Sequence, residues 1–539
     1  MCLDDSGNPS QGCKNGAADC PANRKEAEGM DDRRRSGVKR ATMVRALARI
    51  SIIAALAVVV LAVVAADPRD KHNTLDRYAR DTWTSFVAMT DEVTGLPADS
   101  LHIDSTRSVQ TSITNIGAYM WSTLVAEALR LVSHDEAVSR LDRTLRTLET
   151  MERHQPSGQF FNWYDHTTGE PLTVWPPSGE PLTAVLSSVD NGWLATALHL
   201  VRNRVPELSE RTGALFVSIN FGFYFRPEVN RLLFHYVPST GEAPCCYDTI
   251  VSESRIASYI GMAKGELPSR HYFGTWRSFP DTCDWSWQET KPVGCHRTYY
   301  GVAVFEGTYP YAGMRLVPSW GGSMFEVLMP ALFVPEDQWG PQSWAINHLV
   351  TVQAQIHQGL EEAQYGYWGF SPATIPEGGY TTYGVDGLGM NPDGYPSNND
   401  MTVVDHGFPG CPGREPMPDP PPSAYTNGVV TPHAAFLALR WAPEATIENL
   451  ANLARDFAIY TAWGFRDAVN VDTGVVSPYY LALDQGIIMA AIGNALAQDM
   501  LREAFVTPEF RRALQPVIGV ETFNASPLSH MHDTSINRR

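Results

Sequence analysis

The sequence predicts an all-α protein, and three observations support this. Apolar residues recur at three- and four-residue intervals through most of the chain, which is the spacing of an amphipathic helix. Strand patterns are few and short, and none continues long enough to predict a sheet. With 44% hydrophobic and 19% charged residues, the composition is typical of a folded chain and excludes both disorder and a protein with many membrane spans. Helices without a sheet to cover pack on one another, so we expect one large helical domain.

The first 66 residues differ from the rest of the chain. They hold 10 of the 41 Lys and Arg residues but only 7 of the 59 Asp and Glu residues. Residues 50–66 form an apolar run with Ser51 as its one polar member, and seven basic residues lie between positions 33 and 49. This order is typical of an export signal, and the run also reaches the lower limit for a membrane-spanning helix. A cleaved signal and a single-span anchor are equally favoured; residues 1–49 are expected to be a disordered extension, and the chain after residue 66 to be exported.

Ten helices are predicted in the exported part. They lie at residues 74–89, 112–132, 135–154, 189–202, 249–264, 324–333, 344–363, 432–441, 446–461 and 484–504. The segment 135–154 has the clearest amphipathic pattern and is followed by Pro156 and Gly158, which end a helix.

Non-helical segments separate these helices. Residues 221–225 and 231–236 predict a minor β-hairpin. Residues 277–318 are rich in aromatic residues and residues 405–424 are rich in proline, and both are expected to be loops. The domain is expected to cover residues 67–523, and residues 524–539 to form a disordered tail.

Charge and cysteine content restrict the partners. The net charge of −18 argues against nucleic acid, since binding phosphates requires a basic face. Five cysteines follow residue 66, and an odd number in an exported chain predicts at most two disulfides. Cys283 and Cys295 are close enough in sequence to pair, and Cys411 then has Cys245 or Cys246 as a partner. The cysteine and histidine spacing does not fit zinc, so we expect no metal and no cofactor.

Acidic residues within aromatic and apolar segments are the chemical feature that remains, because no nucleophile elbow, phosphate loop or metalloprotease motif is present. The candidates are Asp190, Glu253, Glu326, Glu377 and Asp467. Apolar surroundings raise the pKa of a carboxyl group, as a general acid requires, and aromatic rings stack on sugars. Paired carboxylates among aromatic residues are therefore typical of glycoside hydrolysis.

Each candidate also has a structural interpretation. Asp190 is placed to cap the helix that follows it, and Asp467 to cap a turn. Glu253 is two residues from Arg255 and has the spacing for an ion pair with it. Glu326 precedes Val327 and is placed to accept hydrogen bonds from helix-terminal amides.

Several motifs in a fixed order resemble the glycoamylase-like family. The segment 319–330 (SWGGSMFEVLMP) carries the resemblance together with residues 187–195, 246–248, 256–260, 263–268, 271–273, 367–371, 383–389, 430–435, 464–470 and 483–488. This family includes the endo-β-1,2-glucanases and the C-terminal transglycosylase region of cyclic β-1,2-glucan synthases. The resemblance covers about 110–500, nearly the whole exported part.

The resemblance implies an (α/α)6 toroid, a barrel of six inner helices with long aromatic loops at one end. It implies a monomeric glycoside hydrolase that acts on an oligo- or polysaccharide, either a β-glucan or another cell-envelope glycan. The catalytic residues expected from it are Glu253 as the general acid, with Asp467 or Glu326 acting on the water or on the charged transition state. The expected substrate-binding residues are Asp190, Trp193, Tyr247, Arg255, Trp320, Trp368 and Glu377.

One departure from the family pattern leaves the activity open. Where the synthases carry Ser-Glu-Ser-Ala-Tyr after a Trp-Gly pair, this chain has residues 371–380 (SPATIPEGGY), with its glutamate displaced to Glu377. A transglycosylase that remodels glycans and a carbohydrate-binding protein that has lost catalysis therefore remain alternatives to the hydrolase.

Overall fold

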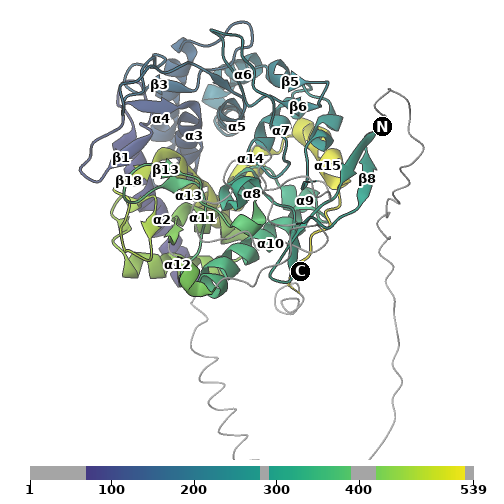
Figure 1. Cartoon of the computed structure of the whole chain (residues 1–539). Helices are drawn as coiled ribbons and strands as arrows, with labels where there is room; N and C mark the ends of the chain where they lie inside the picture. The colour runs from purple at the N-terminus through teal and green to yellow at the C-terminus, as the bar shows by residue number, and fades with distance from the viewer. Residues whose placement is uncertain (1–67, 280–290, 390–420, 426, 529–539) are drawn as a thin grey trace, which may run out of the picture.

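The computed structural model describes residues 68–279, 291–389, 421–425 and 427–528. Over these residues the fold is mainly helical, which confirms that prediction (Figure 1). The α-helices are α2 (Pro68–Met89), α3 (Ile113–Ala128), α4 (His134–Thr150), α5 (Ser188–Arg204), α6 (Ser209–Ser218), α7 (Arg255–Ala263), α8 (Met324–Leu328), α9 (Glu336–Trp339), α10 (Trp344–His357), α11 (Pro432–Leu437), α12 (Pro443–Asp456), α13 (Ala482–Leu496), α14 (Met500–Phe505) and α15 (Pro508–Gly519).

Six of these helices pack in a fixed succession. Helix α3 packs on α5, α5 on α7, α8 on α11, α11 on α13, and α13 on α3. The contact between α7 and α8 is made by Arg255, the first residue of α7, whose guanidinium donates to the backbone oxygens of Glu326 and Val327 in α8. Gly192 permits the close approach of α5 and α7, because a Cβ at this position would lie 3.0 Å from Ala257.

The remaining long helices cover these six from outside. Helix α2 packs on α3 and α13, α4 on α3, α6 on α5, α15 on α7, α10 on α8, and α12 on α11. The burial pattern explains the two groups. In α3 nearly every residue is buried, whereas α4 buries one face that includes Leu141, Leu145 and Leu148. A helix that is apolar all round belongs inside, and one with a single apolar stripe belongs outside.

The strands form short antiparallel pairs between the helices, and several lie at the outer edge in Figure 1. The pairs are β1 (Ser100–His102) with β18 (Tyr479–Leu481), β2 (Gln110–Ser112) with β3 (Trp163–Asp165), β4 (Leu186–Ser187) with β7 (His235–Tyr236), β5 (Phe225–Arg226) with β6 (Arg231–Leu232), β8 (His296–Tyr299) with β9 (Val302–Phe305), β10 (Tyr309–Tyr311) with β11 (Met314–Leu316), β12 (Ala373–Thr374) with β13 (Tyr380–Thr381), β14 (Val429–Val430) with β17 (Val469–Asn470), and β15 (Tyr460–Thr461) with β16 (Gly464–Phe465).

The structure differs from the sequence predictions at several elements. The predicted hairpin at 221–236 forms, but it is shorter than expected, with β5 paired to β6. The expectation of a loop over 277–318 is wrong, because β8–β9 and β10–β11 are hairpins. The turn of β8–β9 is Tyr300-Gly301, and both residues have positive φ, as a tight hairpin turn requires. The pattern of apolar residues did not predict α6, which is short, or α15, which begins with Pro508 and contains Pro516.

The two ends of the chain and most cysteines lie largely outside the described residues. Residues 1–67, with the predicted extension and signal or anchor, are among them, as are Cys283 and Cys411. Among the described helices, none is long and apolar enough to cross a membrane. The structure joins Cys245 to Cys246 rather than either of them to Cys411. At the other end, Ser526 pairs with Arg315 through two backbone hydrogen bonds of 2.8 and 3.0 Å, so the ordered chain extends beyond residue 523.

Candidate active site

Glu253 and Glu326 meet where α7 and α8 begin. The backbone N–H of Glu253 donates to Oε2 of Glu326 at 2.6 Å. The indole Nε1 of Trp193, in the first turns of α5, donates to Oε2 of Glu253 at 2.5 Å. Both glutamates are partly exposed, so their free oxygens remain accessible. Two acidic residues far apart in sequence thus form a pair.

The pair holds its protons well above the ordinary carboxyl range. Burial raises the pKa of Glu253 well above its usual value, and the nearby charge of Glu326 raises it further. Burial also raises the pKa of Glu326 to about 7, although the hydrogen bond from the Glu253 amide opposes this. Two carboxyl groups this close do not both ionise near neutral pH. Glu253 therefore keeps its proton to a higher pH than an ordinary carboxyl group, as a proton donor must.

Asp190 is the third acidic residue of this group. Its Oδ1 accepts a hydrogen bond of 2.5 Å from Oγ1 of Thr114 at the start of α3, and its charge also raises the pKa of Glu253. Asp190 is not the cap of α5, because the cap is Ser187, whose Oγ accepts the Asp190 amide at 3.3 Å. Ser323 caps α8 in the same way. Neither Asp190 nor Glu326 therefore caps its own helix. Glu326 instead accepts the backbone N–H of Glu253, which lies just before α7.

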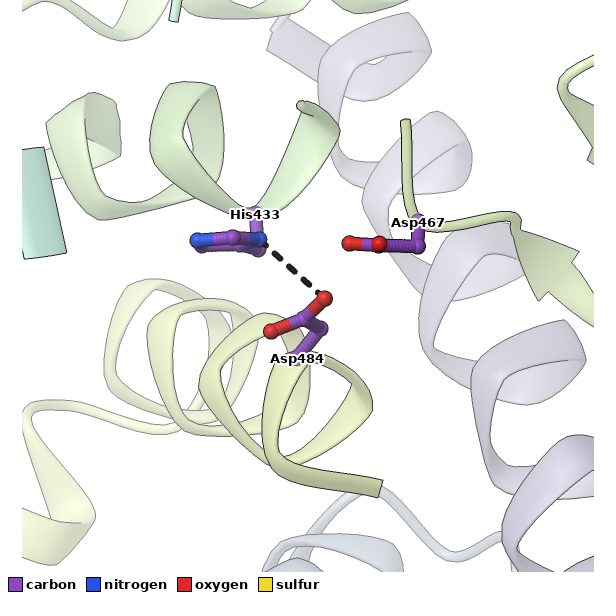
Figure 2. A group of neighbouring side chains, drawn as sticks. All are labelled: His433, Asp467 and Asp484. Carbon is purple, nitrogen blue, oxygen red and sulfur yellow. Dashed lines mark ion pairs between the residues drawn. The ribbon is translucent and has the colours of Figure 1, made fainter. Parts of the chain in front are cut away.

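A second acidic group consists of Asp467 and Asp484 with His433 (Figure 2). Figure 2 shows the three side chains converging from α11, from α13 and from the segment after β16. Nδ1 of His433 lies 3.3 Å from Oδ2 of Asp484. Oδ2 of Asp467 accepts two hydrogen bonds from Thr374, 2.6 Å from its amide and 2.5 Å from its hydroxyl. All three side chains are at least nine-tenths buried.

This second group also retains a proton. Burial and the charge of Asp484 raise the pKa of Asp467 well above its usual value, and burial raises the pKa of Asp484 to about 7. Burial lowers the pKa of His433 to about 4, so its imidazole is neutral. Among the described residues, no amide or hydroxyl donates to Oδ1 of Asp467 or to Oδ2 of Asp484, which has only Nδ1 of His433 at 3.3 Å; this fits one proton shared between the two carboxyl groups.

The same three residues offer ligand atoms within 4.8 Å of one another, as a metal ion would require. The hydrogen bonds of His433 argue against this. Nδ1 of His433 lies 2.7 Å from the hydroxyl of Thr431, which itself donates to the backbone oxygen of Asp467 at 2.7 Å. The single hydroxyl proton is thus used, so Nδ1 carries a proton and is not free to bind a metal.

Tyr380, on β13, is 60% exposed. Desolvation raises the pKa of its hydroxyl, and the charges of Asp484, Asp467, Asp99 and Glu253 raise it further. Carboxyl groups of both acidic groups therefore act electrostatically on one tyrosine.

The predicted aromatic residues fall into two kinds. Tyr247 and Trp320 are half-buried, and their ring centroids are 5.6 Å apart, next to Phe234. Trp193 and Trp368 are 1% exposed, so the prediction that they stack on sugar is wrong. Their apolar surface lies in the core, and Trp193 reaches the site only through its indole N–H.

Arg255 and Glu377 were also predicted to contact the substrate. Arg255 is 3% exposed and bonds to Glu336, not to Glu253, so it presents no surface to a substrate and forms neither predicted contact. Glu377 is exposed in the turn between β12 and β13, where Oγ1 of Thr473 lies 3.5 Å from its Oε1. Glu377 thus lies on the hairpin that carries Tyr380.

Sequence reasoning missed Asp99, Asp484, His433 and Tyr380. Asp99 accepts a hydrogen bond of 2.7 Å from Nδ2 of Asn115 in α3, and its charge acts on Asp484. The shared signal is position, because functional groups of both acidic clusters lie at or just before the N-terminal ends of α3, α5, α7, α8, α11 and α13. This rule becomes visible only once the six helices are known to pack together.

Family comparison agrees with this geometry. Residues 290–508 match the Glycoamylase family model, described as "Putative glucoamylase", and residues 77–221 match a model for a protein family of unknown function. Over residues 290–508 the chain is therefore similar to the Glycoamylase family. The match includes Glu326, His433, Asp467 and Asp484, while Glu253 lies between the two matched regions.

Individual relatives extend the comparison. The chain is 25% identical over 572 aligned residues to a cyclic β-(1,2)-glucan synthase of Rhizobium meliloti, covering 80% of this chain and 18% of that protein. It is 26% identical over 148 residues to an exo β-1,2-glucooligosaccharide sophorohydrolase of Parabacteroides distasonis, covering 27% of this chain and 18% of that protein. The chain thus spans about a fifth of the length of the curated relatives it matches.

The fold has solved counterparts. An endo-β-1,2-glucanase from Chitinophaga pinensis, in complex with sophorotriose and glucose, matches with a TM-score of 0.59 and 17% identity. The match covers 83% of this chain and 98% of that chain. At this identity the likeness establishes the shared fold.

The raised carboxyl pKa values predict that the protein loses stability as the pH rises. Glu326 and Asp484 keep their protons up to about pH 7 when folded, but release them at ordinary carboxyl values when unfolded. The contribution to stability is therefore complete only below about pH 4, is lost progressively as the pH rises, and is gone above about pH 7. We expect the melting temperature to fall between about pH 4 and 7 and then to level off, measured by calorimetry. Glu326→Gln should flatten this dependence and Glu377→Gln should preserve it; an unchanged slope in Glu326→Gln would contradict the assignment.

Proposed function

We propose that the chain is a glycoside hydrolase that cleaves a β-1,2-glucan or a closely related β-glucan. The observation that carries the proposal is the presence of two pairs of carboxyl groups, Glu253–Glu326 and Asp467–Asp484, whose pKa values are raised and whose charges both act on Tyr380. Glycoside hydrolysis needs one carboxyl group that donates a proton and another that activates water. The two relatives are named for activities on β-1,2-linked glucans, which supports the substrate class.

We assign the general acid to Glu253. Of the two glutamates, Glu253 has the more strongly raised pKa, and its Oε2 is held by Trp193 while its other oxygen remains free to donate. Glu326 accepts the Glu253 amide and raises the acid's pKa by its charge, which suits a supporting role. The proton passes from Glu253 to the glycosidic oxygen as the bond to the anomeric carbon breaks.

Asp467 is assigned as the group that activates water. Thr374 fixes its Oδ2 with two hydrogen bonds, so the proposal gives the proton-accepting role to Oδ1, which is buried beside Asp484, once the shared proton has left the pair. Asp484 shares one proton with Asp467. The pair acts as a base after it has lost this shared proton. Placing acid and base in separate groups favours inversion, with water attacking the face opposite to the leaving group.

The remaining features follow from the same interpretation. The succession α3, α5, α7, α8, α11 and α13, each covered by an outer helix, supports an (α/α)6 toroid with the site at the N-terminal ends of the inner helices. Tyr247 and Trp320 are the sugar platforms in this scheme. Export through residues 50–66 and a monomeric state complete the proposal.

A product profile tests the proposed function. The protein is incubated with linear β-1,2-glucan and with β-1,3- and β-1,4-linked glucans, and the products are separated by chromatography. We expect short β-1,2-linked oligosaccharides, with the anomeric configuration at the cut inverted by NMR at early times. Products longer than the substrate would instead support the transglycosylase, and binding without turnover would support the non-catalytic carbohydrate-binding protein.

A further inference from the structure

Arg255 forms a buried junction between the two helices that carry the acid pair. It is the first residue of α7 and lies two positions after Glu253. Its guanidinium makes five hydrogen bonds: Nε to Oε1 of Glu336 at 2.6 Å, Nη2 to Oε2 of Glu336 at 3.0 Å, Nη1 to the backbone oxygens of Ser252 at 2.9 Å and of Glu326 at 2.7 Å, and Nη2 to the backbone oxygen of Val327 at 2.6 Å. All three carbonyls belong to or adjoin a residue of the acid pair, since Ser252 precedes Glu253 and Val327 follows Glu326.

Glu336, in α9, holds the guanidinium from its other side. It is fully buried and accepts further hydrogen bonds from the hydroxyl of Tyr259 at 2.7 Å and from Nε2 of His348 at 3.0 Å. Arg255 and His348 hold the pKa of Glu336 near 2 despite its burial, so the pair with Arg255 is ionised at working pH. Trp344 covers the guanidinium at 4.5 Å from its ring centroid. The guanidinium is thus fixed in one orientation.

We propose that Arg255 is a positioning residue that sets the separation of Glu253 and Glu326 by binding the backbone on both sides of the pair. This inference rests on the proposed function of the pair. Because Nη1 bridges the carbonyls of Ser252 and Glu326, the start of α7 cannot move relative to α8 without breaking a buried hydrogen bond to a charged group. The Glu253 amide is thereby kept on Glu326.

The planar fork of arginine is needed for this task. Lysine carries the same charge but has a single nitrogen, which cannot bond Glu336 and three carbonyls at once. Arg255→Lys therefore retains the ion pair with Glu336 and releases the carbonyl contacts. Lysine keeps the positive charge that lowers the pKa of Glu253, and Asp190, whose charge raises it, is unchanged. With the pair less tightly held, the charge of Glu326 acts less on Glu253, and the pKa of Glu253 falls toward its ordinary value.

The chain contains a matched control. Arg277 and Glu521 form another fully buried pair, in which Tyr272 donates to Glu521 as Tyr259 does to Glu336. Arg277 also bonds a carbonyl, that of Thr275 at 2.6 Å, but it contacts neither Glu253 nor Glu326. Arg277→Lys weakens a similar buried Arg–Glu pair and its carbonyl contact, but it breaks no contact to Glu253 or Glu326.

The test compares Arg255→Lys with Arg277→Lys below the melting temperature of both. We expect both variants to lose stability, but Arg255→Lys alone to lower kcat on β-1,2-glucan by about 10–100-fold with little change in KM. Its alkaline limb of kcat against pH should move to lower pH, because the acid loses its proton earlier. A wild-type pH profile and kcat in Arg255→Lys, or an equal change in Arg277→Lys, would overturn the proposal.

A second measurement does not depend on turnover. The carboxyl carbons of 13C-labelled glutamate are titrated by NMR in the full chain, with Glu253→Gln used to assign the signal of Glu253. We expect a lower pKa for Glu253 in Arg255→Lys than in the wild type, and no such shift in Arg277→Lys. If Arg255→Lys does not fold, Glu336→Gln, which weakens the hold on the guanidinium, takes its place. An inactive wild type with the expected shift would reject the proposed function and keep the positioning role, whereas an unshifted pKa would reject the positioning role.

Discussion

Replacing Glu253 by glutamine is expected to lower kcat on β-1,2-glucan by about 10²–10⁴-fold. The amide has the shape of the acid but no proton to give to the glycosidic oxygen. Folding should be unaffected, because the amide oxygen still accepts the hydrogen bond from Trp193 and a desolvated carboxyl group is removed. Calorimetry should show an unchanged or raised melting temperature.

The leaving group distinguishes the loss of the acid from a general loss of activity. An oligosaccharide with a nitrophenyl leaving group needs little protonation, so Glu253→Gln should recover much of its rate on this substrate. Glu210→Gln is the matched control, since Glu210 is exposed on the outer helix α6 and outside both acidic groups. Full activity of Glu253→Gln on β-1,2-glucan would remove Glu253 from the mechanism.

Replacing Asp467 by asparagine is expected to cause a loss of similar size, about 10²–10⁴-fold in kcat. Thr374 can still donate to the amide oxygen, so the local fold is kept while the base is lost. The nitrophenyl substrate should give no recovery here, because activation of water is needed whatever the leaving group. Recovery with this substrate would show that Asp467 does not act on the water.

The sequence was a good guide to the helices and a partial guide to the site. Periodicity located the long helices, because the spacing of apolar residues is a local property. The periodicity did not predict the β8–β9 hairpin, whose Tyr300-Gly301 turn lies in a segment rich in aromatic residues. Burial was the harder quantity: Trp193 and Trp368 looked like sugar platforms, but exposure depends on which helices pack against them.

The same limit explains the errors on individual site residues. Arg255 looked like a partner for Glu253 because the two are neighbours in sequence, yet the helical start turns its guanidinium toward Glu336, 81 residues away. Asp484 and His433 carried no distinguishing local signal. They become notable only through Asp467, which another segment brings between them (Figure 2).

The sequence by itself determined that the chain is helical and acidic, and which carboxylates lie among apolar and aromatic neighbours. These properties follow from composition and spacing, which need no knowledge of distant contacts. Only the tertiary structure decided which carboxylates meet, that Glu253 pairs with Glu326 and Asp467 with Asp484, and that Arg255 lies behind the first pair. Pairing arises from helices that are distant in the chain, and the pKa values depend on burial and neighbouring charge, so both are properties of the packed molecule.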